Sequence, residues 1–134
     1  MTCAALFVKV NNRFVKDAFN RYVAATGAVP DSTTGLLRIT PAQYANLQSL
    51  FFKAGGTTFE LTANAQIWPR ALNTFIGGTA GNIYLIVNSI GSPTGEGFDF
   101  INGYTFLERF YSVFDSGNRR VGFATTLFTT ATSN

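Results

Sequence analysis

The sequence predicts a mainly β fold with two or three short helices, and three observations support that class. Apolar and polar residues alternate over 57–63 (TTFELTA), which is the period of a half-buried strand. Near the C-terminus, two apolar runs flank Asp-Ser-Gly-Asn, the residue types that a tight hairpin turn favours. Helical patterns are few and short, so most of the regular structure is expected to be sheet.

The first half of the chain contains the clearest helix patterns. Residues 15–26 (VKDAFNRYVAAT) place apolar side chains at helical spacing, and Gly27 follows where a left-handed cap is favoured. In residues 39–50 (ITPAQYANLQSL), Thr40 is the predicted N-cap and Pro41 the first helical residue. The apolar face of that second helix is predicted to carry Tyr44, Leu47 and Leu50.

Strand patterns dominate the remainder. Residues 4–10 are apolar enough for a strand, and a glycine pair turns the chain before the alternating run. Residues 64–72 (NAQIWPRAL) are expected to form an irregular or helical turn that is interrupted at Pro69. Further strands are predicted at 82–88, 110–114 and 120–125.

Composition indicates one globular domain. The chain has 134 residues, of which 46% are hydrophobic and only 13% charged, so a buried core is expected. The net charge of +3 comes from scattered basic residues, only Arg119 and Arg120 being adjacent, and no nucleic-acid partner is predicted. No segment approaches the roughly 20 apolar residues that span a membrane, so no membrane partner is predicted.

The sequence contains few types of side chain that could act in catalysis. The chain has one cysteine and no histidine, which excludes Ser-His-Asp and Cys-His catalysis and argues against a zinc or iron site. No cofactor is therefore predicted. The seven acidic residues are well separated along the chain, so what remains is chemistry performed by carboxylates alone, or no chemistry.

One long segment carries a family resemblance. Residues 98–124 (FDFINGYTFLERFYSVFDSGNRRVGFA) are similar to the end of the pepsin-like aspartic endopeptidases: an apolar-apolar-Gly motif, a short helix, a tyrosine-rich strand, then the pattern V-[FY]-D-x-x-N-x-[RK]-[VI]-G-[FL]-A. Residues 17–52 and 59–73 resemble the fungal branch, closest to the polyporopepsin-type enzymes of wood-rotting basidiomycetes. The resemblance runs from Asp17 to about Thr126 and implies the fold of the C-terminal lobe.

The resemblance implies a reaction that needs two lobes. Each lobe of such an enzyme contributes one Asp-Thr-Gly or Asp-Ser-Gly loop, and the two carboxylates share a proton. The loop of this lobe would lie near Leu6, Phe7 and Val8, where the sequence has no aspartate. We therefore predict no catalytic residue, and divide the chain into a divergent segment (1–14), the pepsin-like lobe (15–126) and a frayed tail (127–134).

Asp115-Ser116-Gly117 spells a catalytic tripeptide, but it falls at the hairpin position of the family pattern. Because Asp, Ser, Gly and Asn are also turn-forming residues, we interpret Asp115 as a turn residue. The alternative is a homodimeric peptidase in which each chain contributes Asp115.

The candidate cleft wall is the segment Ile101-Asn102-Gly103. It matches the apolar-apolar-Gly motif, with asparagine at the second apolar position. The resemblance implies that this motif passes beneath the catalytic loop and shapes the cleft. Ile101 has a simpler interpretation as an ordinary core residue, which we favour.

Three functions follow from the resemblance. The first is a catalytically inactive C-terminal lobe, and the second is the homodimeric peptidase already described. The third is a non-catalytic module that keeps half of a peptide cleft and binds a peptide or protein partner. Self-association through an exposed lobe interface is a further expectation. The localisation stays open, because the family is secreted while the first residues carry only a weak signal-peptide pattern.

Overall fold

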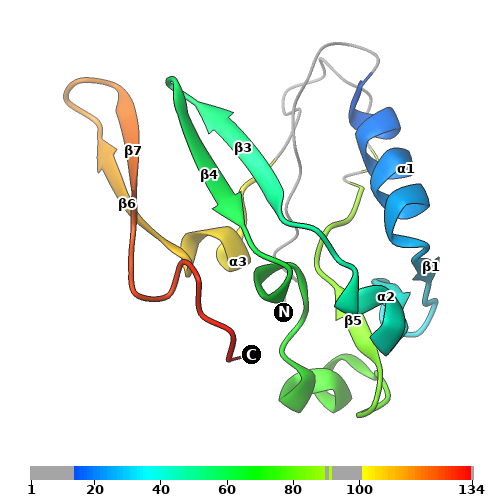
Figure 1. Cartoon of the computed structure of the whole chain (residues 1–134). Coiled ribbons are helices and arrows are strands. Elements are labelled where there is room, and N and C mark those ends of the chain that lie inside the picture. The colour runs from blue at the N-terminus through cyan, green and yellow to red at the C-terminus, as the bar shows by residue number, and fades with distance from the viewer. Residues whose placement is uncertain (1–13, 90, 92–100, 134) are drawn as a thin grey trace.

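The computed structural model describes residues 14–89, 91 and 101–133 (Figure 1). Strands are the most numerous elements in that part of the chain, and a few helices join them, which agrees with the mainly β fold that the sequence predicts. In order, the elements are α1 (Phe14–Thr26), β1 (Val29–Pro30), β2 (Leu37–Ile39), α2 (Pro41–Ala45), β3 (Leu50–Ala54), β4 (Thr57–Leu61), the 3-10 helices η1 (Asn64–Gln66) and η2 (Arg70–Ile76), β5 (Ile83–Leu85), α3 (Tyr104–Leu107), β6 (Phe110–Asp115) and β7 (Arg120–Thr125).

The described strands form three small antiparallel sheets. β1, β2 and β5 make a three-stranded sheet in that order, while β3–β4 and β6–β7 are two hairpins (Figure 1). The predicted strands at 110–114 and 120–125 are confirmed, and the one at 57–63 is confirmed over Thr57–Leu61. The predicted strand at 82–88 is confirmed only in its centre, as β5. Residues 4–10, also predicted as a strand, lie outside the described residues.

Helix α1 ends as the sequence predicts. Gly27 has a φ of 63°, the left-handed region in which glycine is unstrained, and its N–H donates to the carbonyl of Val23 at 2.9 Å. The Gln43 Nε2 atom donates to the Gly27 carbonyl at 2.7 Å, which ties the end of α1 to α2. A Cβ at residue 27 would lie 2.6 Å from that Nε2 atom, so any larger residue would have to displace the Gln43 side chain from this hydrogen bond.

Helix α2 begins as predicted and ends earlier. Thr40 and Gln43 form a reciprocal capping box and Pro41 is the first helical residue, but the helix stops at Ala45. The prediction that Leu47 and Leu50 lie on its apolar face is therefore wrong. Leu50 instead begins β3, because it pairs with Leu61 of β4.

Two buried clusters make up the interior. The first, here called the aromatic core, packs phenylalanines edge to face, as in Phe59–Phe110 at 5.5 Å between ring centroids. It consists of Phe52, Phe59, Leu61, Ala65, Ile86, Phe106 and Phe110. The second, the aliphatic core, lies beneath α1 and α2 and consists of Ala28, Leu37, Ile39, Ile67, Ile83 and Leu85.

The C-terminal residues are held against the rest of the molecule. The guanidinium of Arg109 donates to the carbonyls of Phe128 and Ala131, and Asn64 donates to the carbonyl of Thr132. Thr129 is buried, with 6% of its surface exposed. The predicted fraying of the tail is therefore wrong for residues 127–132, because buried side chains supply partners for its backbone.

Candidate functional site

The candidate cleft wall leads into helix α3. Gly103 caps that helix, and its carbonyl accepts hydrogen bonds from the N–H groups of Phe106 and Leu107 at 3.0 and 3.1 Å. Ile101 is 46% exposed, so the interpretation of Ile101 as a core residue is wrong. The core contact of this region comes from Phe106, which packs between Phe52 and Phe110.

Apolar side chains continue along the outer side of α3. Tyr104 is 70% exposed and Leu107 38% exposed, whereas Thr105 between them is buried. Ile101, Tyr104 and Leu107 therefore leave apolar surface uncovered at the point where the resemblance places a cleft. The Oδ1 atom of Asn102, in contrast, is buried and has no hydrogen-bond partner among the described residues.

Asp115 is a turn residue, as predicted. It ends β6, its backbone pairs with Arg120 of β7, and its carboxylate accepts hydrogen bonds from the backbone and side chain of Asn118. The Arg120 Nε atom also donates to it, at 2.7 Å. These bonds from Asn118 and Arg120 lower the pKa of Asp115. A carboxylate held in its charged form in this way does not readily share a proton with a second one.

The other described carboxylates are engaged locally. Asp31 accepts from Thr33 and Thr34 in the turn between β1 and β2, and Glu60 accepts from the hydroxyl of Ser49. Glu108 lies 4.0 Å from the Nε atom of Arg109. Burial raises the pKa of Glu108 and the neighbouring guanidinium opposes the shift. None of these carboxylates is placed as half of a catalytic dyad.

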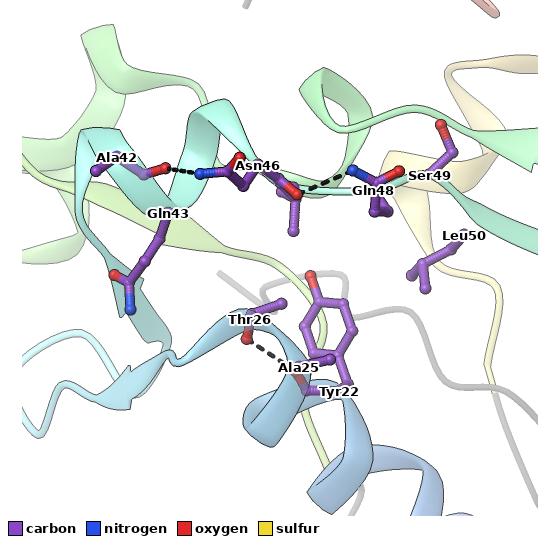
Figure 2. A pocket seen from close by; sticks show the side chains of 10 residues that line it. Tyr22, Ala25, Thr26, Ala42, Gln43, Asn46, Gln48, Ser49 and Leu50 are labelled. Atoms are coloured by element: carbon purple, nitrogen blue, oxygen red, sulfur yellow. Dashed lines mark hydrogen bonds between the residues drawn. The ribbon is translucent and has the colours of Figure 1, made fainter.

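A pocket of about 370 Å³ lies between α1 and the segment that joins α2 to β3 (Figure 2). The hydroxyl of Tyr22 at its wall donates to Oε1 of Gln66 at 3.0 Å, and burial raises the pKa of that hydroxyl above its usual range. Ser49, also in the lining, is bonded to Glu60. None of the described residues that line the pocket supplies a carboxylate.

Gln66 is the polar residue that sequence reasoning missed. It is fully buried, and its Nε2 atom donates to the carbonyls of Gln48, Leu61 and Thr62. The sequence signal is weak: a glutamine between Ala65 and the apolar pair Ile67 and Trp68. In the part of the chain that the structure describes, no three acidic, cysteine or histidine side chains gather as a metal site would require.

Comparison with known proteins identifies the family. Residues 12–126 match the family model for eukaryotic aspartyl proteases. The chain belongs to that family. It is 73% identical over 118 residues to polyporopepsin from Irpex lacteus, and 37% identical over 102 residues to gastricsin from Suncus murinus. The crystal structure of the aspartic proteinase from Irpex lacteus matches the whole chain with a TM-score of 0.88 at 65% identity.

The chain corresponds to part of these aspartic proteases. The similarity covers 88% of this chain but 35% of polyporopepsin, and the structural match covers 37% of the Irpex lacteus enzyme. The matched part is the C-terminal lobe, which confirms the predicted fold. Among the described residues no helix is long and apolar enough to cross a membrane.

Proposed function

We propose that this chain forms the C-terminal half of the substrate cleft of a two-lobed aspartic protease, and that by itself it does not hydrolyse peptides. The observation that carries the proposal is the position of Asp115. It is the aspartate of the only Asp-Ser-Gly tripeptide in the sequence, and it serves a hairpin turn. Where the resemblance places the catalytic loop, the sequence has Leu6, Phe7 and Val8.

The chemistry requires more than this lobe supplies. In a two-aspartate mechanism, one carboxylate accepts a proton from water while the other donates a proton to the peptide carbonyl oxygen. The lobe would contribute the wall at Ile101–Gly103 and the exposed apolar side chains of α3 to such a cleft. Both carboxylates would have to come from elsewhere.

Peptidase assays test the proposal directly. We expect the purified chain to leave denatured haemoglobin intact at acidic pH. A chimera in which this chain, from residue 12 onward, replaces the matching part of polyporopepsin should cleave haemoglobin, with inhibition by pepstatin. Pepstatin-sensitive cleavage by the chain alone, abolished by Asp115→Asn, would overturn the proposal in favour of the homodimeric peptidase. An inactive, well-folded chimera would show that this lobe is not competent to complete a cleft.

A second candidate is a self-associating or protein-binding module, and the β6–β7 hairpin favours it. Tyr111, Val113, Phe114 and Val121 are between 49% and 71% exposed, and they lie on both faces of the hairpin. Apolar surface of this kind promotes association, and each hairpin strand has one edge without a partner strand among the described strands. Asp115 and Arg120 neutralise each other at the hairpin end, so charge would not oppose association.

Sedimentation velocity over a concentration series tests the second candidate. The wild-type chain should associate as its concentration rises, and Phe114→Lys should shift it to the monomer because a charge replaces an apolar contact. Phe51→Lys is the matched control, since Phe51 is 63% exposed on β3, away from the hairpin. A wild-type chain that stays monomeric at all concentrations, or equal effects of the two substitutions, would contradict association through the hairpin.

A further inference from the structure

Three side-chain atoms of the described residues are buried without a hydrogen-bond partner: Trp68 Nε1, Asn73 Oδ1 and Asn102 Oδ1. The first two belong to residues with evident structural roles. Trp68 packs against the aromatic core, and the Nδ2 atom of Asn73 donates to the carbonyls of Thr79, Ala80 and Asn82. The side-chain amide of Asn102, in contrast, makes no hydrogen bond to another described residue.

A buried acceptor without a donor destabilises a fold, so native proteins almost always supply one. The family pattern has an apolar residue at this position, which would avoid the cost entirely. Asn102 also lies between exposed Ile101 and the N-cap Gly103, on the wall that the proposed function assigns to the cleft. The missing donor is therefore expected from a group that belongs to the completed cleft.

We propose that Asn102 is a positioning residue, whose Oδ1 accepts a hydrogen bond from an N–H or O–H group of the catalytic loop in a complete two-lobed protease. The inference rests on the proposed function, because a lobe that never completes a cleft has no such loop. Asn102 touches neither substrate nor water in this role. It would act by fixing the loop that carries the carboxylate, and through it the alignment of the attacking water.

The substitution Asn102→Leu tests this proposal. It should stabilise the chain alone but lower the activity of the chimera. In the chain alone, it replaces an unsatisfied acceptor by an apolar side chain of similar branching, so the urea midpoint of unfolding should rise. In the chimera with polyporopepsin it removes a hydrogen bond, so kcat should fall roughly two- to tenfold with KM unchanged. Asn102→Asp keeps an acceptor at the same place and should preserve most of the kcat at acidic pH.

Each outcome bears on the proposal. A lower urea midpoint for Asn102→Leu in the chain alone would overturn it, since the acceptor would then be satisfied within the lobe. An unchanged kcat in the chimera would also overturn it while leaving the proposed function intact. If the chimera with Asn102 is itself inactive, the proposed function fails and this inference fails with it.

Discussion

The hydrogen-bond partners of Asp115 hold its carboxylate in the hairpin turn and in its charged form. Its two oxygens accept hydrogen bonds from Asn118 and Arg120, all within five residues along the chain. These bonds favour the charged form, which lowers the pKa of Asp115 below its ordinary value. In the unfolded chain the bonds are absent and the pKa returns to that value. Ionised Asp115 therefore stabilises the fold.

We expect the stabilisation by Asp115 to depend on pH. A lowered pKa in the folded state contributes stability above the unfolded pKa, and that stability is lost as the pH falls through the folded pKa. Asp115→Asn should therefore lower the free energy of unfolding at neutral pH, and its effect should shrink towards strongly acidic pH. Urea unfolding of both proteins across that range measures the difference. A difference that does not vary with pH would show that the charge has no part in it.

The role of Asp115 could be predicted from sequence because a hairpin turn depends on adjacent residues. The exposure of Ile101 could not be predicted in the same way. It depends on which side of α3 is covered by Phe52, from a distant strand, and by Phe110, and Phe106 takes the covered side. A pattern of apolar residues identifies the candidates for burial without choosing among them.

The C-terminal segment is fixed by a single buried cation. Arg109, only 4% exposed, donates through one nitrogen to the carbonyls of Phe128 and Ala131 and through another to Asn64. The hydroxyls of Thr126 and Thr129 donate in return to the carbonyl of Arg109. The start of β6 and the tail after β7 therefore form one unit (Figure 1).

Replacing Arg109 by methionine should release this segment. The aliphatic volume is largely kept, but the tail carbonyls lose their donors, so we expect the free energy of unfolding to fall by roughly 2–4 kcal/mol. Limited proteolysis should then cut within residues 126–132 faster than in the wild-type chain. Arg38→Met, at an exposed position of β2, is the control and should change stability by less than about 0.5 kcal/mol. Equal protease resistance of the Arg109→Met and wild-type tails would contradict the role of Arg109.

The two errors in the predicted elements have a common physical origin. Periodicity extended the second helix to Leu50, but pairing with Leu61 draws Leu50 into a sheet. The tail was predicted to fray, but Arg109 holds it from about twenty residues earlier in the chain. In both cases a contact with a separate segment overrides the local pattern.

Gln66 joins the two cores of the lobe. Its side chain reaches Tyr22 of α1, which packs on the aliphatic core, and the carbonyl of Leu61, which belongs to the aromatic core. Its backbone carbonyl accepts from the N–H of Ile86. Gln66 thus links α1 to the β3–β4 hairpin through its side-chain amide, and it reaches the chain after β5 through its backbone carbonyl.

Substitution of Gln66 by leucine should weaken the whole lobe. It leaves the Tyr22 hydroxyl without its partner and three carbonyls without a donor, so we expect a loss of roughly 2–4 kcal/mol in the free energy of unfolding. Gln48→Leu is the matched control, because the Gln48 side chain is exposed, and its effect should stay below about 0.5 kcal/mol. Urea titrations followed by tryptophan fluorescence compare the two. Similar losses for both variants would show that the buried amide has no special part.

The fold class and the membership of a protease family follow from strand patterns and from a long motif near the C-terminus, both of which are local in sequence. The links that hold the lobe together are not local. Gln66 and Tyr22 are 44 residues apart, and Asn64 and Arg109 are 45 apart. A polar residue inside an apolar run marks such a link, but its partner can be found only in three dimensions.

The guanidinium of Arg109 also constrains when this lobe can finish folding during its synthesis. The two carbonyls that it holds belong to residues 19 and 22 positions later in the chain. Until those residues leave the ribosome, a cation near the start of β6 lacks the partners that allow it to leave water. We therefore expect the β6–β7 hairpin of the nascent chain to stay open until Phe128 and Ala131 have emerged and can accept these hydrogen bonds.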